Sequence, residues 1–388
     1  MHIIDELMSR LAAILFIAFQ LLIIHPSAVA QHKADSLTDE VKSKINNTFR
    51  YFTFGFYIDT YINITLDNIR DTSNLIPFSS NCPVRDQIRM NHAALEVYYN
   101  ADKVRGKLAL QYGDAPNLLA TANAQFIKTI RQANFGFRIV NNLWIDMGYL
   151  INPIGYESSW VVINQISTVT IGGYFSFGNV LGIKLSYKFN EKFSGGIMAG
   201  DPYTLAHEQN NRLGAIVFFT YKPIPNLSLT YNNFFGNAAL RTSEVKETGV
   251  YNNLIVTYNP IPKVALVGQF DCAFQNNSSM PPDTTNVAGM YSGFLQARYI
   301  FSDHFAVTTR YEFFNDPNGL LSDIYFYDGK IRGLLTNGFA LEFEYKPVKF
   351  GFIRAGYKYI HANKGNNVYY SNTSDHMNAL IFTAGVRF

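Results

Sequence analysis

Cysteine and charge are both scarce in this sequence. The 388 residues contain only two cysteines, Cys82 and Cys272, which excludes a disulfide framework and a four-thiolate metal site. We expect both to be isolated small residues, with a mutual disulfide as the alternative. Charged residues make up 16% of the chain, and the formal net charge is +3. A balance this small gives no reason to expect nucleic acid as a partner.

Long apolar runs are also missing, except at the N-terminus. There a basic residue precedes an apolar run from Leu11 to Ile24, and small residues surround Ala30. This order predicts a Sec-type signal peptide over residues 1–30, cleaved after Ala30. The run is shorter than the roughly 20 residues of a spanning helix, so a membrane anchor is the weaker alternative. Initiation at Met1 and initiation at Met8 both stay open.

Aromatic residues, in contrast, are abundant at 15%, and from residue 51 onward apolar residues alternate with polar ones. The stretches "FTFGFYIDTYINIT" and "ALEFEYK" show this period of two, which is typical of strands with unlike faces. Many of these runs are longer than the strands of a soluble sandwich, which is the alternative, and they reach the roughly 9–11 residues that a membrane-crossing strand needs. The pattern therefore favours a membrane barrel.

Short and long connections alternate along the same region. The short ones lie at 100–103, 140–142, 190–192, 223–226, 260–263, 302–304 and 347–349. The long polar ones lie near 67–87, 114–124, 153–173, 202–211, 237–247, 276–287, 317–333 and 363–376. Alternation of this kind predicts an all-β fold, a transmembrane antiparallel up-and-down barrel over residues 51–388, with both termini on the short-turn side. We expect about 16 strands, with 14 or 18 as alternatives, and a charged periplasmic leader over residues 31–50.

The chain ends on a strand-like stretch, "MNALIFTAGVRF", whose last residue is Phe388. Inside a bilayer every backbone donor and acceptor must be paired, so the last strand of a barrel has to pair with the first. We expect Phe388 to help close the barrel. The final aromatic strand also resembles the signal by which outer-membrane proteins are recognised by their assembly machinery.

Two stretches carry a more specific likeness. "YNADKVRGKLALQYG" at 99–113 and "NLWIDMGYLINPIGYES" at 142–158 resemble the OmpL-like β-barrel porins of Gram-negative outer membranes. In that family a strand with a Trp-Asp-Gly pattern runs into a loop with Pro, Ile-Gly and an acidic residue. The matching residues here are Trp144, Asp146, Gly148, Pro153, Ile154, Gly155, Tyr156 and Glu157. The resemblance implies a diffusion channel in an outer membrane.

The polar face of the predicted strands carries charges of both signs. Lumen water can solvate them, whereas Arg or Lys on the lipid face near the bilayer midplane costs about 2–4 kcal/mol. We expect pore-lining or constriction roles for Arg105, Lys107, Arg138, Asp146, Glu157, Arg310, Glu312, Glu342, Glu344, Arg354 and Lys358, and lumen positions for Asp59, Glu96, Lys128, Lys184, Asp271 and Arg298. The alternative role is bracing of the wall by cross-strand ion pairs.

The loop at 153–173 is too apolar to stand exposed in water, because it contains Trp160, Val161 and Val162. We expect it to fold into the barrel, where Glu157 would face lumen charges such as Arg138 or Arg354 and form a charged constriction. Packing against a neighbouring subunit is the alternative, since exposed apolar patches often mark interfaces. A homo-oligomer therefore stays open.

The function that these patterns predict is passive diffusion of small hydrophilic solutes or ions, with the outer-membrane lipid bilayer and the assembly machinery as partners. An adhesin or assembly scaffold is one alternative and a barrel lipid hydrolase another. His92, His207, His304 and His361 lie in no hydrolase motif. Asp316 and Asp323 lack the calcium-loop order, so a turn is the better interpretation. No enzymatic activity, cofactor or metal is expected.

Overall fold

The computed structural model describes residues 49–67, 73–119, 128–204, 214–236, 248–279, 286–327, 330–363 and 367–388. The predicted signal peptide over 1–30 and nearly all of the predicted leader over 31–50 lie outside the described residues, as do parts of several predicted long loops. None of the described helices has the length and apolar character needed to cross a membrane.

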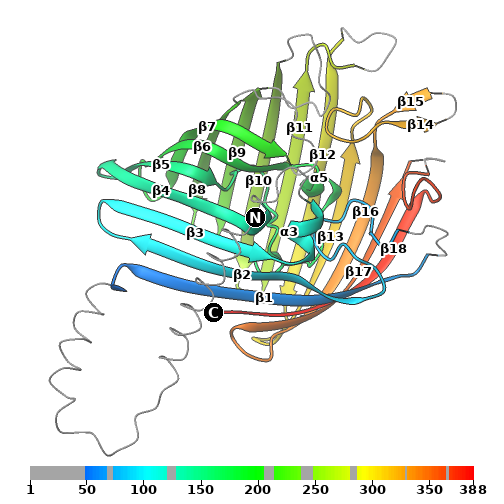
Figure 1. Cartoon of the computed structure of the whole chain (residues 1–388), viewed down its shortest axis with the longest axis horizontal. Helices are drawn as coiled ribbons and strands as arrows, with labels where there is room; N and C mark the ends of the chain where they lie inside the picture. The colour runs from blue at the N-terminus through cyan, green and yellow to red at the C-terminus, as the bar shows by residue number, and fades with distance from the viewer. Residues whose placement is uncertain are drawn as a thin grey trace, which may run out of the picture. The chain divides into compact units, whose positions relative to one another are not determined.

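Within the described residues, antiparallel strands close into one barrel, shown in Figure 1. Its sixteen strands are β1 (Phe52–Thr65), β2 (Ile88–Asn100), β3 (Val104–Tyr112), β4 (Ile130–Val140), β5 (Leu143–Leu150), β6 (Phe177–Lys188), β7 (Phe193–Thr204), β8 (Gly214–Ile224), β9 (Leu227–Gly236), β10 (Gly249–Ile261), β11 (Val264–Gln275), β12 (Ala288–Ile300), β13 (Phe305–Asn315), β16 (Leu335–Tyr345), β17 (Gly351–Ala362) and β18 (His376–Arg387). The remaining elements are the hairpin β14 (Tyr325–Tyr327) and β15 (Lys330–Arg332) and the helices α3 (Asp114–Leu119) and α5 (Ile171–Tyr174). The predicted barrel of about 16 strands is confirmed.

Connections between the barrel strands alternate in length, as the sequence predicts. The short ones span 101–103, 141–142, 189–192, 225–226, 262–263, 301–304 and 346–350. The long ones lie at the other end of the strands, and the short-turn end also holds the start of β1 and the end of β18. The two strands pair from Tyr57 opposite Arg387 to Thr65 opposite Ala379. Phe388 N–H donates to the Phe56 carbonyl (3.0 Å), and Phe56 N–H donates to the Phe388 carbonyl (3.3 Å), which extends this pairing to the last residue.

The barrel wall has apolar side chains on its outer face and polar ones on its inner face, which is the reverse of a soluble protein. Large apolar side chains such as Leu295, Phe339 and Phe343 are exposed on the outside. Their neighbours in sequence point inward and are buried, including polar ones such as Gln296 and Glu342. A wall with this pattern is stable where the outside meets lipid and the inside meets water or packed polar groups.

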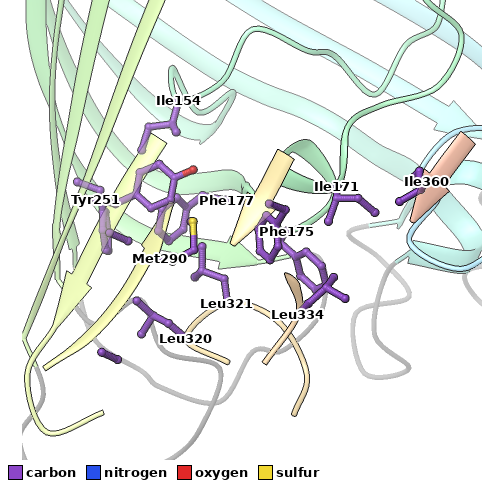
Figure 2. Close-up of a cluster of buried hydrophobic side chains, with 14 of the residues drawn as sticks. Ile154, Ile171, Phe175, Phe177, Tyr251, Met290, Leu320, Leu321, Leu334 and Ile360 are labelled. Carbon is purple, nitrogen blue, oxygen red and sulfur yellow. The ribbon is translucent and has the colours of Figure 1, made fainter. Parts of the chain in front are cut away.

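An apolar core lies inside the barrel toward the long-loop end; we refer to it as the loop cluster. Figure 2 shows part of it, with side chains from the loop 151–176 meeting side chains from the strands and from the loop 316–334. The labelled members are Ile154, Ile171, Phe175, Phe177, Tyr251, Met290, Leu320, Leu321, Leu334 and Ile360. Phe78 of the first long loop packs on Phe175 (5.6 Å between ring centres) and on Tyr369 of the last one (5.8 Å). Four long loops therefore share this core.

Asp316 fixes the loop that follows β13. Its carboxylate accepts backbone N–H groups from Leu320 and Leu321 (both 2.8 Å), an arrangement typical of a turn. Burial raises the pKa of the Asp316 carboxyl, against the effect of these hydrogen bonds. Its oxygens are thus occupied by the chain itself.

Candidate pore lining

Asp146 on β5 holds cations from two other strands at the inner wall. Its Oδ1 accepts from Arg105 Nε on β3 (2.7 Å), and its Oδ2 accepts from Arg105 Nη2 (2.6 Å). Lys184 Nζ on β6 lies 3.8 Å from Asp146 Oδ2. A bidentate ion pair such as that of Arg105 with Asp146 is stronger and better oriented than a pair with a single hydrogen bond.

The strand register explains how Arg105 reaches over an intervening strand. Arg105 is opposite Gly136 of β4, and Gly136 is opposite Asp146. A Cβ atom at Gly136 would lie only 2.3 Å from Asp146 Oδ1. Glycine therefore leaves the space through which the two charged groups meet.

The structure explains each residue of the Trp-Asp-Gly pattern of β5. Trp144 points inward beside Asp146, and the Arg105 guanidinium lies over its ring, 4.3 Å from the centre. Arg138 lies farther from the same ring, at 6.0 Å, and pairs with Asp102 in a short turn. Gly148 has φ +124°, a conformation that favours glycine, and a Cβ there would lie 2.4 Å from the Ala133 carbonyl oxygen.

A second carboxylate, Glu96 on β2, repeats the arrangement. It pairs with Lys107 Nζ of β3 (2.7 Å) and with Arg387 Nη2 of β18 (3.1 Å), and it accepts the Tyr98 hydroxyl (2.6 Å). The strands β18 and β2 both pair with β1, so this cluster lies next to the seam of the barrel.

In these two clusters the cations face water and the carboxylates lie behind them. The exposed fractions of the side chains are 33% for Arg105, 17% for Lys107, 27% for Lys184 and 37% for Arg387. Those of Asp146 and Glu96 are 4% and 3%. We refer to these six residues as the basic wall.

The charged residues of β12–β17 form a different environment, which we refer to as the covered wall. Its members are Arg298, Arg310, Glu312, Glu342, Glu344, Arg354 and Lys358, and no side chain among them is more than 9% exposed. Arg354 Nη2 pairs with Glu344 (2.7 Å) and its Nε lies 3.6 Å from Glu342, while Arg298 also pairs with Glu344. Lys358 Nζ lies 3.5 Å from Glu312.

The loop 151–176 covers these charges and uses them as anchors. Arg354 donates to the carbonyls of Val161 and Asn164 (both 2.9 Å). Lys358 Nζ donates to the Val169 carbonyl (2.6 Å). In the other direction, the Ser167 N–H donates to Glu342 Oε2 (2.9 Å) and the Ile171 N–H donates to Glu312 Oε2 (2.8 Å). The wall thus binds the backbone of a loop that lies inside the barrel.

Glu157 has a different partner from the two that we expected. It pairs with Arg310 Nη1 (2.6 Å), whereas Arg138 pairs with Asp102 and Arg354 with Glu342 and Glu344. Its Oε2 accepts the Thr170 hydroxyl (2.5 Å) and the Thr170 N–H (2.9 Å). Arg310 is a lumen charge, but neither of the two examples is the observed partner, because the choice depends on where the loop crosses the lumen, which its sequence does not specify. Glu157 ties the two ends of the loop together and to β13.

The first part of the loop contacts strands on both sides of the lumen. The Gly155 N–H donates to Asn253 Oδ1 on β10 (3.1 Å), and the Tyr156 N–H donates to Gln269 Oε1 on β11 (2.8 Å). Trp160 is fully buried, with its ring 5.3 Å from that of Tyr57 on β1 and the Arg131 guanidinium of β4 over it at 3.9 Å.

Sequence reasoning missed four of these anchors: Tyr57, Arg131, Asn253 and Gln269. The period of two places Tyr57, Asn253 and Gln269 on the inner face. It would have placed Arg131 outward with Phe135, but a bulge at Arg131 shifts the register of β4 and turns this side chain inward. Lys128, which we expected on the lumen wall, instead precedes β4 and donates to the Asn117 carbonyl (3.2 Å).

Alternative chemistry finds little support in the geometry of the described residues. His92 is buried, and its Nδ1 lies 3.9 Å from Asp59 Oδ1 without forming a hydrogen bond. Both cysteines are free thiols, so the alternative of a mutual disulfide is wrong. In the part of the chain that the structure describes, no three His, Cys, Asp or Glu side chains are grouped to hold a metal ion.

Comparison with known proteins agrees with this geometry. The family model described as "putative beta-barrel porin-2, OmpL-like" matches residues 51–388. A search of curated proteins finds no match.

Several solved structures share the fold. OmpF of Salmonella typhi, in complex with daunomycin, is 12% identical with a TM-score of 0.59, covering 87% of this chain and 97% of that one. The outer-membrane channel DcaP of Acinetobacter baumannii is 11% identical with a TM-score of 0.56 and the same coverage. The anion-selective porin of Comamonas acidovorans is 9% identical with a TM-score of 0.54, covering 87% and 99%. At these identities the likeness establishes the fold alone.

Proposed function

Because this chain belongs to the OmpL-like β-barrel porin family, we propose that it is an outer-membrane porin through which small hydrophilic solutes or ions diffuse passively. The observation that supports this most strongly is the basic wall. Four cationic side chains on the inner face keep contact with water, although they lie inside a closed barrel. A barrel of about 16 strands is wide enough to hold an aqueous channel.

The loop 151–176 crosses the lumen and narrows that channel. Its anchors lie on β1, β4, β10–β13 and β16–β18, and the wall charges of β12–β17 are buried beneath it. The water-facing cations lie on β3, β6 and the end of β18, at the short-turn half of the barrel. We therefore place the passage along the basic wall, with the loop as the constriction. Glu157, Arg310, Glu312, Glu342, Glu344, Arg354 and Lys358 serve to hold the constriction, and Arg105, Lys107, Arg138 and Asp146 line the passage.

The same proposal includes the route to the membrane. Residues 1–30 direct Sec-type export, residues 31–50 stay in the periplasm of a Gram-negative bacterium, and the last strand with Phe388 is recognised by the outer-membrane assembly machinery. Passive diffusion needs no catalyst or cofactor.

A second candidate is a scaffold or adhesin whose lumen is plugged. The loop cluster favours it, because four long loops pack an apolar core at the end of the barrel where solutes would enter. A plugged barrel would present its loops to a partner and conduct nothing.

Single-channel recording on the refolded full barrel in a planar bilayer separates the two. A porin gives steady, voltage-stable conductance steps. A barrel that is folded, as judged by its heat-modifiable mobility on a gel, but gives no steps would contradict the porin and support the scaffold.

A further inference from the structure

The two charged regions of the lumen differ in net charge as well as in exposure. In the basic wall, four cations face two carboxylates, which leaves two positive charges in excess. In the covered wall, the four cations Arg298, Arg310, Arg354 and Lys358 are balanced by the wall carboxylates Glu312, Glu342 and Glu344 together with Glu157 of the loop. The positive excess therefore lies where water reaches.

The depth of the carboxylates strengthens this excess. Asp146 and Glu96 are nearly fully buried, so a solute in the lumen meets the ends of Arg105, Lys107, Lys184 and Arg387 first. The Arg105 guanidinium is kept in place by stacking on Trp144 and by its bidentate ion pair with Asp146. A cleft lined by one sign of charge with low-dielectric walls concentrates ions of the opposite sign.

Other charges at the short-turn end do not reverse the balance. Arg138 pairs with Asp102, and Lys188 pairs with Glu191 (2.5 Å), so each of these exposed pairs is neutral. The inward carboxylate of β11, Asp271, lies in the long-loop half of its strand, where it is buried and accepts hydrogen bonds from Asn253 (2.6 Å) and Gln269 (2.8 Å).

From this placement we propose that the channel prefers small anions over cations and that the basic wall is the selectivity element. The inference rests on the proposed porin function and adds the charge class of the solute. Charges act mainly within a Debye length, about 8 Å at physiological salt, so the selectivity belongs to the solutes that pass close to this wall.

The test is the reversal potential of single channels in a KCl gradient, for the full barrel and for three variants. Lys107→Gln with Lys184→Gln removes the positive excess while Asp146 keeps Arg105, and Glu96 keeps Arg387 and Tyr98. Lys107→Arg with Lys184→Arg keeps the charge. Lys263→Gln with Lys349→Gln removes two charges from short turns and serves as the matched control.

We expect a chloride-over-potassium permeability ratio above one for the parent barrel, the arginine pair and the turn pair, and a ratio close to one for Lys107→Gln with Lys184→Gln. Conductance without anion preference in the parent, or a glutamine pair indistinguishable from the turn pair, would overturn the selectivity element while leaving the porin intact. Absence of any conductance in the parent would instead refute the proposed function on which this inference rests.

Discussion

At the scale of single residues, Gly136 decides whether the basic wall can form. Arg105 and Asp146 meet above it, and a Cβ there would lie 2.3 Å from Asp146 Oδ1 and 2.8 Å from the Ile145 carbonyl oxygen. We expect Gly136→Ala to lower the free energy of unfolding of the refolded barrel by about 1–3 kcal/mol, the usual cost of overpacking. Denaturant titration in detergent measures it.

Gly106 provides the control for this substitution, because it lies on β3 facing outward and the nearest atom to a Cβ there is the Asn134 carbonyl oxygen at 3.4 Å. Gly106→Ala should therefore change stability little. Equal losses for the two variants would show that Gly136 has no special role in the ion pair.

Phe388 is the second residue with a specific prediction. It joins β1 through two backbone hydrogen bonds with Phe56, and its ring packs near those of Phe56 (6.3 Å) and Phe350 (6.0 Å). Phe388→Ala should lower the yield of assembled barrel in cells more than it alters the conductance of barrels that do form. Heat-modifiable gel mobility reports the yield.

Phe301→Ala is a suitable comparison, since Phe301 is also an exposed aromatic residue at the short-turn end but not at the seam. Normal assembly of Phe388→Ala, or an equal loss with Phe301→Ala, would mean that the terminal residue serves no assembly function of its own.

The residue scale also shows what could be predicted from sequence. Inward positions such as Arg105 and Glu342 follow from the period of two, because neighbouring side chains in a strand point to opposite faces. The Glu157–Arg310 pair did not follow, since it joins residues from a loop and a strand more than a hundred positions apart. Such a pair depends on the path of the loop, and no local pattern encodes that path.

At the scale of elements, the loop 151–176 is the part on which the constriction depends. Removing residues 157–168 eliminates the contacts of Val161, Asn164 and Ser167 with Arg354 and Glu342. Arg354 and Glu342 would then face water, and the lumen would be wider where the loop had crossed it. We expect a larger single-channel conductance with the barrel still assembled.

An unchanged conductance together with loss of an oligomer would assign the loop to an interface instead.

The sequence pointed to an inward loop because Trp160 and Val161 are apolar, and both are fully buried. It did not reveal how the loop is held, because the loop's own part in most of these hydrogen bonds is its backbone N–H and C=O groups, which any sequence carries.

At the scale of the whole molecule, strand number and the alternation of connections followed from the sequence, since the membrane fixes strand length and closure allows no unpaired edge.

We further expect the short-turn end to face the periplasm. In a background without Cys82 and Cys272, an impermeant thiol reagent on intact cells should label Cys at the exposed position 372 in a long loop but not at the exposed position 263 in a short turn. The reverse pattern would invert the orientation.

The central claim is that solutes pass along the basic wall. The direct test is modification of single cysteines during single-channel recording, in the same cysteine-free background. Ser186 lies on β6 beside Arg105 (3.4 Å), whereas Ser292 lies on β12 and is fully buried. A bulky water-soluble thiol reagent should reduce the conductance of Ser186→Cys in discrete steps and leave that of Ser292→Cys unchanged. A block of Ser292→Cys with no effect on Ser186→Cys would contradict the claim.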